Sequence, residues 1–178
     1  MLIIVTVFSG CDLLTVPDAF PYEIMIRQGD LPSSFHFKSS DFPENESGIS
    51  YYVSFQTGEG EVGQFIAQEI TIYPDEKISK EQYQKKVEEI FIIGTYDVLN
   101  SSYKPNNPED LIEYKCENGM INDMPNAICE IVQFHQNLIM YVLVHINEKT
   151  MTKAEFENVM GILDDRLPDD LIPMPPNR

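Results

Sequence analysis

Three cysteines and three histidines are the side chains of this sequence best suited to chemistry. Cys116 and Cys129 lie on two stretches that are predicted to be neighbouring strands. Outside the cytoplasm such a pair favours a disulfide, and closure of a loop of about a dozen residues would stabilise the fold by roughly 3 kcal/mol. The alternative is two buried thiols in strands. A zinc site is disfavoured because the pair lacks the short ligand spacing of such sites.

The three histidines are isolated from one another along the chain. His36 stands between two phenylalanines, His135 lies in a predicted turn and His145 lies at a strand end. A cysteine–histidine nucleophile pair needs one of them beside a free thiol, which the spacing does not support. We interpret each as a surface histidine or as one whose hydrogen bonds are satisfied. No serine-hydrolase, zinc-protease or phosphate-loop pattern occurs, so we expect no catalytic residues, no cofactor and no enzyme.

One glycine motif has the spacing of a dinucleotide-binding loop. Gly58, Gly60 and Gly63 spell G-x-G-x-x-G. A dinucleotide site needs a strand before the motif and a helix that opens within it. Here a predicted strand follows instead, and Glu59 and Glu61 would repel a phosphate. The motif therefore predicts a hairpin turn.

Acidic residues dominate the charge of the chain. It holds 12 basic and 29 acidic residues, for a formal net charge of -17. Because nucleic acid and anionic lipid both require clustered basic residues, we expect neither as a direct partner. We expect the acidic surface to keep the protein soluble and monomeric. A C-terminal group of four aspartates lacks the ligand pattern of a calcium loop and predicts a solvated helix end; its members are Asp164, Asp165, Asp169 and Asp170.

The chain begins with an apolar run that leads into residues 8–11, Phe-Ser-Gly-Cys. This resembles the end of a bacterial lipoprotein signal peptide, in which small residues precede a cysteine that is lipidated and becomes the mature N-terminus. The resemblance implies a signal-peptide remnant at residues 1–10 and lipidation of Cys11. Two departures are a phenylalanine where leucine is usual and the lack of any basic residue before Arg27. The alternative is a buried strand at residues 3–7.

Residues 11–30 are predicted to be a tether between this anchor and the domain. Asp12 to Pro21 carry two prolines and few core residues. Each buried lipid methylene contributes about 0.8 kcal/mol, so several acyl chains anchor a protein without a spanning helix. With Cys11 lipidated, the remaining two cysteines form the pair described above. The predicted location is the extracytoplasmic face of a cell membrane or envelope.

Two helices are predicted from a shared pattern at their starts. Ser79 with Gln82, and Thr152 with Glu155, have the spacing of a capping box, and each is flanked by a hydrophobic staple. Each helix has one apolar face. The residues of these faces are Tyr83, Val87, Ile90 and Phe91 in the first helix and Phe156, Val159, Met160, Leu163 and Leu167 in the second.

Five stretches are predicted to be strands: 49–56, 64–73, 111–116, 127–134 and 138–146. Their order with the helices is two strands, helix, three strands, helix. Short connections between them favour a largely antiparallel sheet. The last strand is apolar on both faces, which predicts a central position. The predicted fold class is α+β, with a mostly antiparallel sheet of five to six strands and two main helices.

This order resembles the α/β/α sandwich of the PsbP and Mog1-like group, whose members often enter the domain through a Leu-Pro-x-x-aromatic segment. Leu31, Pro32 and Phe35 supply such a segment. The resemblance implies a single domain at residues 31–167 that serves in non-enzymatic binding or assembly. Residues 168–178 hold four prolines and are predicted to be an extended tail.

The leading hypothesis is a lipid-anchored, extracytoplasmic protein with a non-catalytic domain that binds a protein or small molecule. One alternative is an extracytoplasmic hydrolase with an unrecognised site, which a pocket joining a histidine to carboxylates would favour. An exposed apolar patch would favour the binding domain. The other alternative is a cytosolic Mog1-like partner-binding protein, which requires an unmodified Cys11 and reduced Cys116 and Cys129.

Overall fold

The computed structural model describes residues 22–43, 45, 47–58, 63–91, 103–121 and 124–169. The predicted signal-peptide remnant and the lipidation site Cys11 lie outside the described residues, as do most of the tether and of the tail. No helix within the described residues is both long and apolar enough to cross a bilayer.

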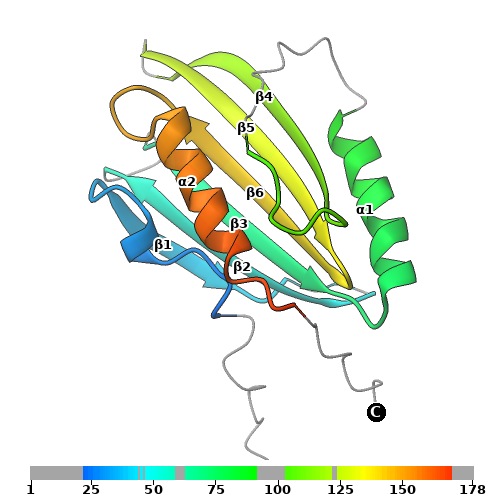
Figure 1. Cartoon of the computed structure of the whole chain (residues 1–178). Coiled ribbons are helices and arrows are strands. Elements are labelled where there is room, and N and C mark those ends of the chain that lie inside the picture. Colours follow the sequence, from blue (N-terminus) through cyan, green and yellow to red (C-terminus); the bar gives the residue numbers. More distant parts are fainter. Residues whose placement is uncertain are drawn as a thin grey trace, which may run out of the picture.

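The core of the fold is one six-stranded antiparallel sheet in the order β1-β2-β3-β6-β5-β4 (Figure 1). The two helices complete an α+β fold, which confirms the predicted class. The last strand of the chain, β6, is central, as its apolar residues on both faces predict. The strands are β1 (Phe35–Asp41), β2 (Ile49–Thr57), β3 (Phe65–Ile72), β4 (Leu111–Ile121), β5 (Met124–His135) and β6 (Leu138–Ile146).

The strand β1 is absent from the prediction, which places two strands before the first helix where the structure has three. Only Phe35 of this strand is buried, and its other six residues are exposed. An edge strand with so little buried surface has no alternation of apolar and polar residues to reveal it. Between Phe37 and Ser39 the pairing with β2 also shifts register, which marks a β-bulge.

The helix α2 (Lys153–Asp164) has the predicted start. The Thr152 side chain accepts a hydrogen bond from the Glu155 backbone, and the Glu155 carboxylate accepts one from the Thr152 backbone at 2.8 Å. This is the capping box. Four of its five predicted core residues, Phe156, Val159, Met160 and Leu163, are buried, and Leu167 packs partly buried beyond the helix end.

The helix α1 (Glu76–Phe91) begins earlier than predicted. Asp75 caps it, because its carboxylate accepts a hydrogen bond from the Ile78 backbone at 2.9 Å. The predicted cap at Ser79 is wrong. Ser79 lies inside the helix, is fully buried, and donates its hydroxyl proton to the Gln136 carbonyl at 3.2 Å. A contact with the distant β5–β6 turn therefore decides the role of this serine.

The helices cover opposite faces of the sheet. Ile131 of β5 packs in the cluster that contains α2, whereas Val132, the next residue, packs in the cluster that contains Tyr83 of α1. Successive side chains of a strand point to opposite faces, so the two clusters lie on the two sides. Figure 1 shows α2 lying across one face of the sheet. The arrangement is an α/β/α sandwich.

Cys116 and Cys129 face each other across β4 and β5. Their Sγ atoms are 1.96 Å apart and their Cα atoms 4.1 Å apart, and both side chains are fully buried. The pair therefore has the placement that a disulfide requires. It joins the edge strand β4 to the inner part of the sheet.

Residues 22–34, here called the N-terminal segment, lie on the same face as α2. The segment contains the short 3-10 helix η1 (Gln28–Asp30). Its residues Ile24, Met25 and Ile26 are part of the core, although the sequence predicts a tether up to residue 30. The packed part of the chain thus begins ahead of residue 31.

The N-terminal segment is fixed by a carboxamide in the core. Gln68 of β3 is fully buried. Its Oε1 accepts a hydrogen bond from the Ile26 backbone at 2.6 Å, and its Nε2 donates to the Ile24 carbonyl at 3.3 Å. The carboxamide thus offers the segment one acceptor and one donor, as a peptide group of a neighbouring strand would. Arg166 also holds the N-terminal segment in place, because it donates two hydrogen bonds to the Asp30 carboxylate at 2.6 and 2.8 Å.

We predict that Gln68→Leu lowers the free energy of unfolding by about 1–3 kcal/mol, because it leaves the Ile26 N–H buried without a partner. Urea unfolding followed by circular dichroism measures the change. Gln84→Leu, at an exposed position of α1, is the matched control and stays within about 0.5 kcal/mol of wild type. Equal stability of the two variants would contradict the role assigned to Gln68.

Candidate functional site

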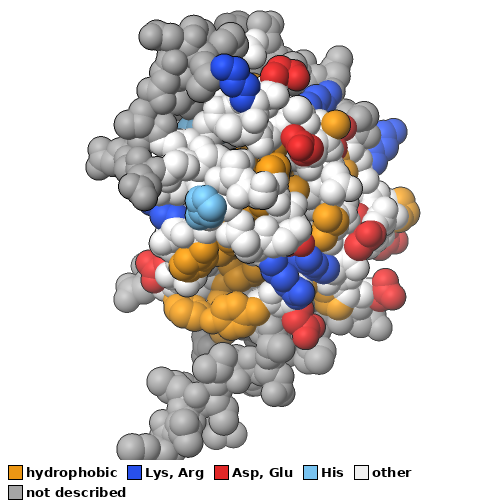
Figure 2. Space-filling model, turned by 90° about the vertical axis from the view of Figure 1, so that its left-hand side faces the viewer, with side chains coloured by type: hydrophobic (Ala, Val, Ile, Leu, Met, Phe, Trp, Pro, Cys, Tyr) orange, Lys and Arg blue, Asp and Glu red, His pale blue; other side chains and the backbone are white. Residues whose placement is uncertain are grey.

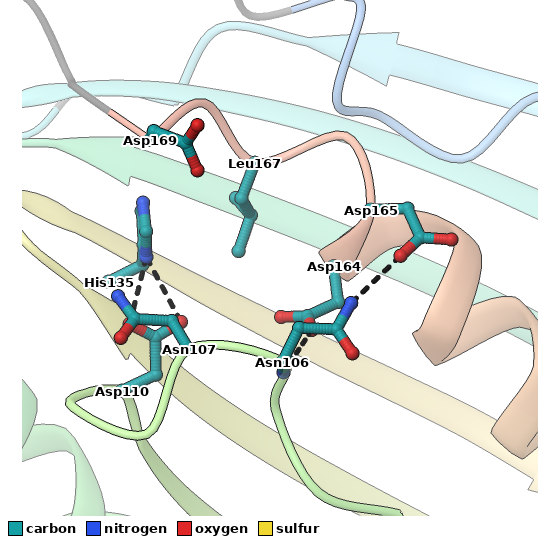
Figure 3. A pocket seen from close by; sticks show the side chains of 8 residues that line it. All are labelled: Asn106, Asn107, Asp110, His135, Asp164, Asp165, Leu167 and Asp169. Atoms are coloured by element: carbon teal, nitrogen blue, oxygen red, sulfur yellow. Dashed lines mark hydrogen bonds and ion pairs between the residues drawn. The ribbon is translucent and has the colours of Figure 1, made fainter.

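Two hollows among the described residues differ in their chemistry. The first, here called the acidic pocket, has a volume of about 430 Å³ and lies where the loop before β4 meets the end of α2 (Figure 3). Its side chains are acidic or amide groups with one histidine and one leucine. They are Asn106, Asn107, Asp110, His135, Asp164, Asp165, Leu167 and Asp169.

His135, at the end of β5, is the chemically versatile side chain of the acidic pocket. Its Nδ1 lies 2.8 and 3.0 Å from the two carboxylate oxygens of Asp110. Its Nε2 lies 3.0 Å from the Pro168 carbonyl oxygen. Each ring nitrogen therefore has an acceptor oxygen within hydrogen-bonding distance. His135 is therefore the satisfied histidine that the sequence predicts, and it is buried rather than exposed on a turn.

Asp164 is the second buried acid of the pocket. Its carboxylate accepts hydrogen bonds from the Asn106 backbone at 2.6 Å and from Gln133 Nε2 at 2.7 Å. The prediction of a solvated helix end fits the exposed Asp165 but is wrong for Asp164. Donors from the loop before β4 and from β5 replace water around this carboxylate. Burial, together with the nearby Asp164 carboxylate, raises the pKa of Tyr103 well above its ordinary value.

The acidic pocket joins a histidine to carboxylates, the feature that favours a hydrolase. A general base, however, needs a ring nitrogen that is open to substrate, and both nitrogens of His135 are engaged. Among the described residues of the lining no serine, threonine, cysteine or lysine is present, which leaves only its aspartates as nucleophiles. Across the part of the chain that the structure describes, no three metal-ligating side chains gather. The geometry fits a structural role, in which these hydrogen bonds hold the loop before β4 against the chain after α2.

The other histidines lie elsewhere. His36 is exposed on β1. His145 is buried on β6, where its ring lies 4.1 Å from that of Phe65, and burial lowers its pKa. His135 pairs with Leu138 at one end of the β5–β6 hairpin, and His145 pairs with Ile128 toward the other. The fold therefore does not combine these histidines into one site.

The structure agrees with the prediction that the glycine motif lies in a hairpin turn. Gly58 and Gly63 lie in the connection between the antiparallel strands β2 and β3. Gly58 has a φ of 74°, which favours glycine, and the Thr57 backbone donates to the Gln64 carbonyl at 2.8 Å to close the connection.

The second hollow, here called the aromatic groove, has a volume of about 350 Å³ and lies between the N-terminal segment and strands β1 and β2. Figure 2 shows hydrophobic side chains gathered on the face of the molecule that carries β1. Met25, Ile26 and Val53 contribute aliphatic surface. Six aromatic residues line the groove: Tyr22, Phe37, Phe42, Tyr51, Tyr52 and Phe55.

The aromatic groove has a buried floor and exposed walls. Tyr51 and Phe55 of β2 are buried in the core and form the floor. Tyr22, Phe37 and Phe42 are 44, 58 and 60% exposed, and each packs edge to face against a floor ring. The ring centroids of these pairs are 5.5 to 6.1 Å apart. Three large aromatics so exposed in one place favour the interpretation of this face as an interaction surface.

Sequence reasoning missed this groove. Its signal was the run Phe35-His36-Phe37 followed by Phe42, which places aromatic residues in an otherwise polar stretch. The sequence interpretation used Phe35 only as part of the entry segment, and Phe35 and Phe37 only as the neighbours of His36. The groove exists because the N-terminal segment folds back beside β1, a long-range contact that no local pattern encodes.

Comparisons of the chain with protein-family models, with curated proteins and with solved structures found no match. The resemblance to the PsbP and Mog1-like group stays a prediction. The candidate function therefore depends on the geometry of the chain itself.

The ion pair that fixes the N-terminal segment gives a test of how the groove is supported. Burial of Asp30 opposes its ionisation, but hydrogen bonds from Arg166 and from the Arg27 backbone outweigh burial and lower the pKa of Asp30 below 3.8, its ordinary value. A carboxyl group whose pKa is lower in the folded state stabilises the fold above its unfolded pKa. That contribution is lost as the pH falls through the folded pKa.

We predict that Asp30→Asn lowers the free energy of unfolding by about 1–3 kcal/mol at neutral pH, because Arg166 loses a charged acceptor. The difference in free energy of unfolding between the variant and wild type becomes smaller as the pH falls from about 5 to about 2. Urea unfolding at a series of pH values measures this difference. A gap that is the same at every pH would show that the charge of Asp30 does not stabilise the fold.

Proposed function

We propose that this chain is a lipid-anchored, extracytoplasmic protein whose domain binds, without catalysis, an apolar segment of a partner protein in the aromatic groove. The observation that carries the proposal is the groove itself, a hollow with buried aromatic floor and exposed aromatic walls. The predicted anchor at Cys11 supports the proposed location, and the groove supports the proposed binding activity.

The chemistry of the groove fits a protein partner. Full burial of one exposed Phe side chain is worth about 1.5–3 kcal/mol, and a few buried aromatics commonly supply most of the binding energy of an interface. Phe37 and Phe42 present such side chains on a rigid strand and its continuation. Arg27 and Asp41 lie at the same groove and supply polar groups for orientation.

One feature of the structure supports a location outside the cytoplasm. Cys116 and Cys129 are placed for a disulfide, which persists in oxidising compartments. This placement also disfavours the cytosolic alternative. The ten residues from Asp12 to Pro21 would span at most about 35 Å when fully extended. Lipidation of Cys11 would therefore keep the groove, which begins at Tyr22, close to the membrane surface, and its partner with it.

An extracytoplasmic hydrolase is the second candidate function, and the acidic pocket is the observation that favours it. A hydrolytic role would require His135 to release Asp110 or the Pro168 carbonyl and turn a nitrogen to substrate. Because the described lining offers no nucleophilic hydroxyl, thiol or amine, such an enzyme would have to activate water or use an aspartate of the pocket as nucleophile. The aromatic walls of the groove are already exposed, so the binding function is the better supported.

Site-specific photo-crosslinking tests the proposed function. We replace Phe42 in the full chain with a photoreactive phenylalanine analogue and irradiate intact cells of the source organism. We expect one discrete cross-linked product in the membrane fraction. Phe37→Ser, introduced into the same chain, lowers its yield about tenfold because one aromatic wall of the groove is lost.

Leu111→Ser is the matched control, because Leu111 is a 39% exposed apolar residue on β4, at the other edge of the sheet. It leaves the product unchanged. A cross-linked product that survives Phe37→Ser, or that Leu111→Ser removes equally, would contradict binding in the aromatic groove.

A further inference from the structure

The outer edge of β1 runs along the aromatic groove. In the six-stranded sheet β1 is a terminal strand, and no described strand pairs with its outer side. A terminal strand offers unpaired N–H and C=O groups to which another extended chain can hydrogen-bond. The backbone groups at this edge therefore help to decide which kind of chain the groove binds.

The edge of β1 is occupied at one point by a side chain. The Gln28 carboxamide donates from Nε2 to the Phe35 carbonyl and accepts at Oε1 from the Phe37 backbone at 3.2 Å. These are the two outward-facing backbone groups, on either side of His36, that an added strand would use. Gln28 thus imitates one peptide group of a neighbouring strand.

Gln28 is placed to leave this position without disturbing the fold. Gln28 is exposed and is the first residue of the 3-10 helix η1. The backbone on either side is held separately, by the hydrogen bond between Ile26 and Gln68 and by the ion pair between Asp30 and Arg166. A rotation of the Gln28 side chain would therefore free the Phe35 carbonyl and the Phe37 N–H while both attachments of the N-terminal segment remain. The Phe35 N–H stays bonded to the Pro32 carbonyl at 3.0 Å.

The remainder of the edge carries further features that protect it from unselective pairing. The register shift between Phe37 and Ser39 leaves Lys38 unpaired in a bulge. Bulges and lysines are common protections of edge strands. The pairing available is therefore short and centred on Phe35 to Phe37, beside the exposed Phe37 ring that forms a wall of the groove.

We propose that the partner of the groove is an extended protein segment that adds to β1 as a strand, displaces the Gln28 carboxamide, and places alternate apolar side chains in the aromatic groove. This inference rests on the proposed function and specifies its partner. Backbone hydrogen bonds at Phe35 and Phe37 supply affinity, and the groove selects apolar side chains at every second position.

The test uses the full chain and a short synthetic peptide of alternating valine and threonine. NMR titration follows the backbone amides of Phe37 and Ser40. We expect Gln28→Ala to bind the peptide about tenfold more tightly than wild type, because the peptide no longer competes with two side-chain hydrogen bonds. Gln28→Glu, which keeps the acceptor but loses the donor, falls between the two.

Three controls make the outcome specific. Gln84→Ala, on α1, binds as wild type does. The same peptide with N-methylated amides does not bind Gln28→Ala, since it cannot donate to the Phe35 carbonyl. Sedimentation shows that Gln28→Ala is monomeric without peptide.

Equal affinity of Gln28→Ala and wild type, or equal binding of the N-methylated peptide, would overturn strand addition. A dimer of Gln28→Ala without peptide would also overturn it, by assigning the edge to a second copy of the chain. These failures are distinct from failure of the proposed function. If Phe37→Ser still abolishes the cross-linked product, the groove binds its partner by apolar contact alone.

Discussion

The hydrogen bonds of one buried carboxamide determine where the N-terminal segment lies, and the surface of the molecule depends on them. Gln68 is fully buried among apolar side chains, where an unpaired amide would cost about 1–3 kcal/mol. Its partners are the backbone groups of Ile24 and Ile26. The same segment supplies Tyr22 to the aromatic groove and Gln28 to the edge of β1. Without this attachment the groove would lose a wall and the edge strand its protection.

The two faces and two edges of the sheet have different roles. The face under α2 and the N-terminal segment holds the larger core, and α1 covers part of the other face. At the edge formed by β4, Cys116 and Cys129 are placed to tie the strand inward, and the acidic pocket holds the loop before β4 to the chain after α2. The edge formed by β1 is protected by the Gln28 side chain, by the bulge at Lys38 and by the Pro32 carbonyl. This asymmetry is why we assign binding to β1 and a structural role to the acidic pocket.

Much of the fold follows from the sequence, because strands β2, β3, β5 and β6 and the helix α2 carry strong local patterns. The pattern of β4 is weaker, and the predicted strand ends at Cys116 where β4 continues to Ile121. Alternating apolar residues locate β2, and the capping box of Thr152 and Glu155 locates the start of α2. The same reasoning misplaces the start of α1, since Ser79 is drawn into a long-range hydrogen bond with the β5–β6 turn. It misses β1, whose side chains are nearly all exposed. The groove was beyond prediction because its three parts, residues 22–28, 37–42 and 51–55, meet only in the folded chain.

The central claim, a domain held outside the cytoplasm by a lipid on Cys11, is tested most directly by the intact mass of the protein. The gene is expressed with its native upstream DNA in a bacterial host, and the protein is extracted from the membranes. The account predicts a chain that starts at Cys11, heavier by a diacylglyceryl or triacyl group and lighter by the two hydrogens lost when Cys116 and Cys129 are joined. An unlipidated chain in the soluble fraction, still carrying residues 1–10, would contradict it.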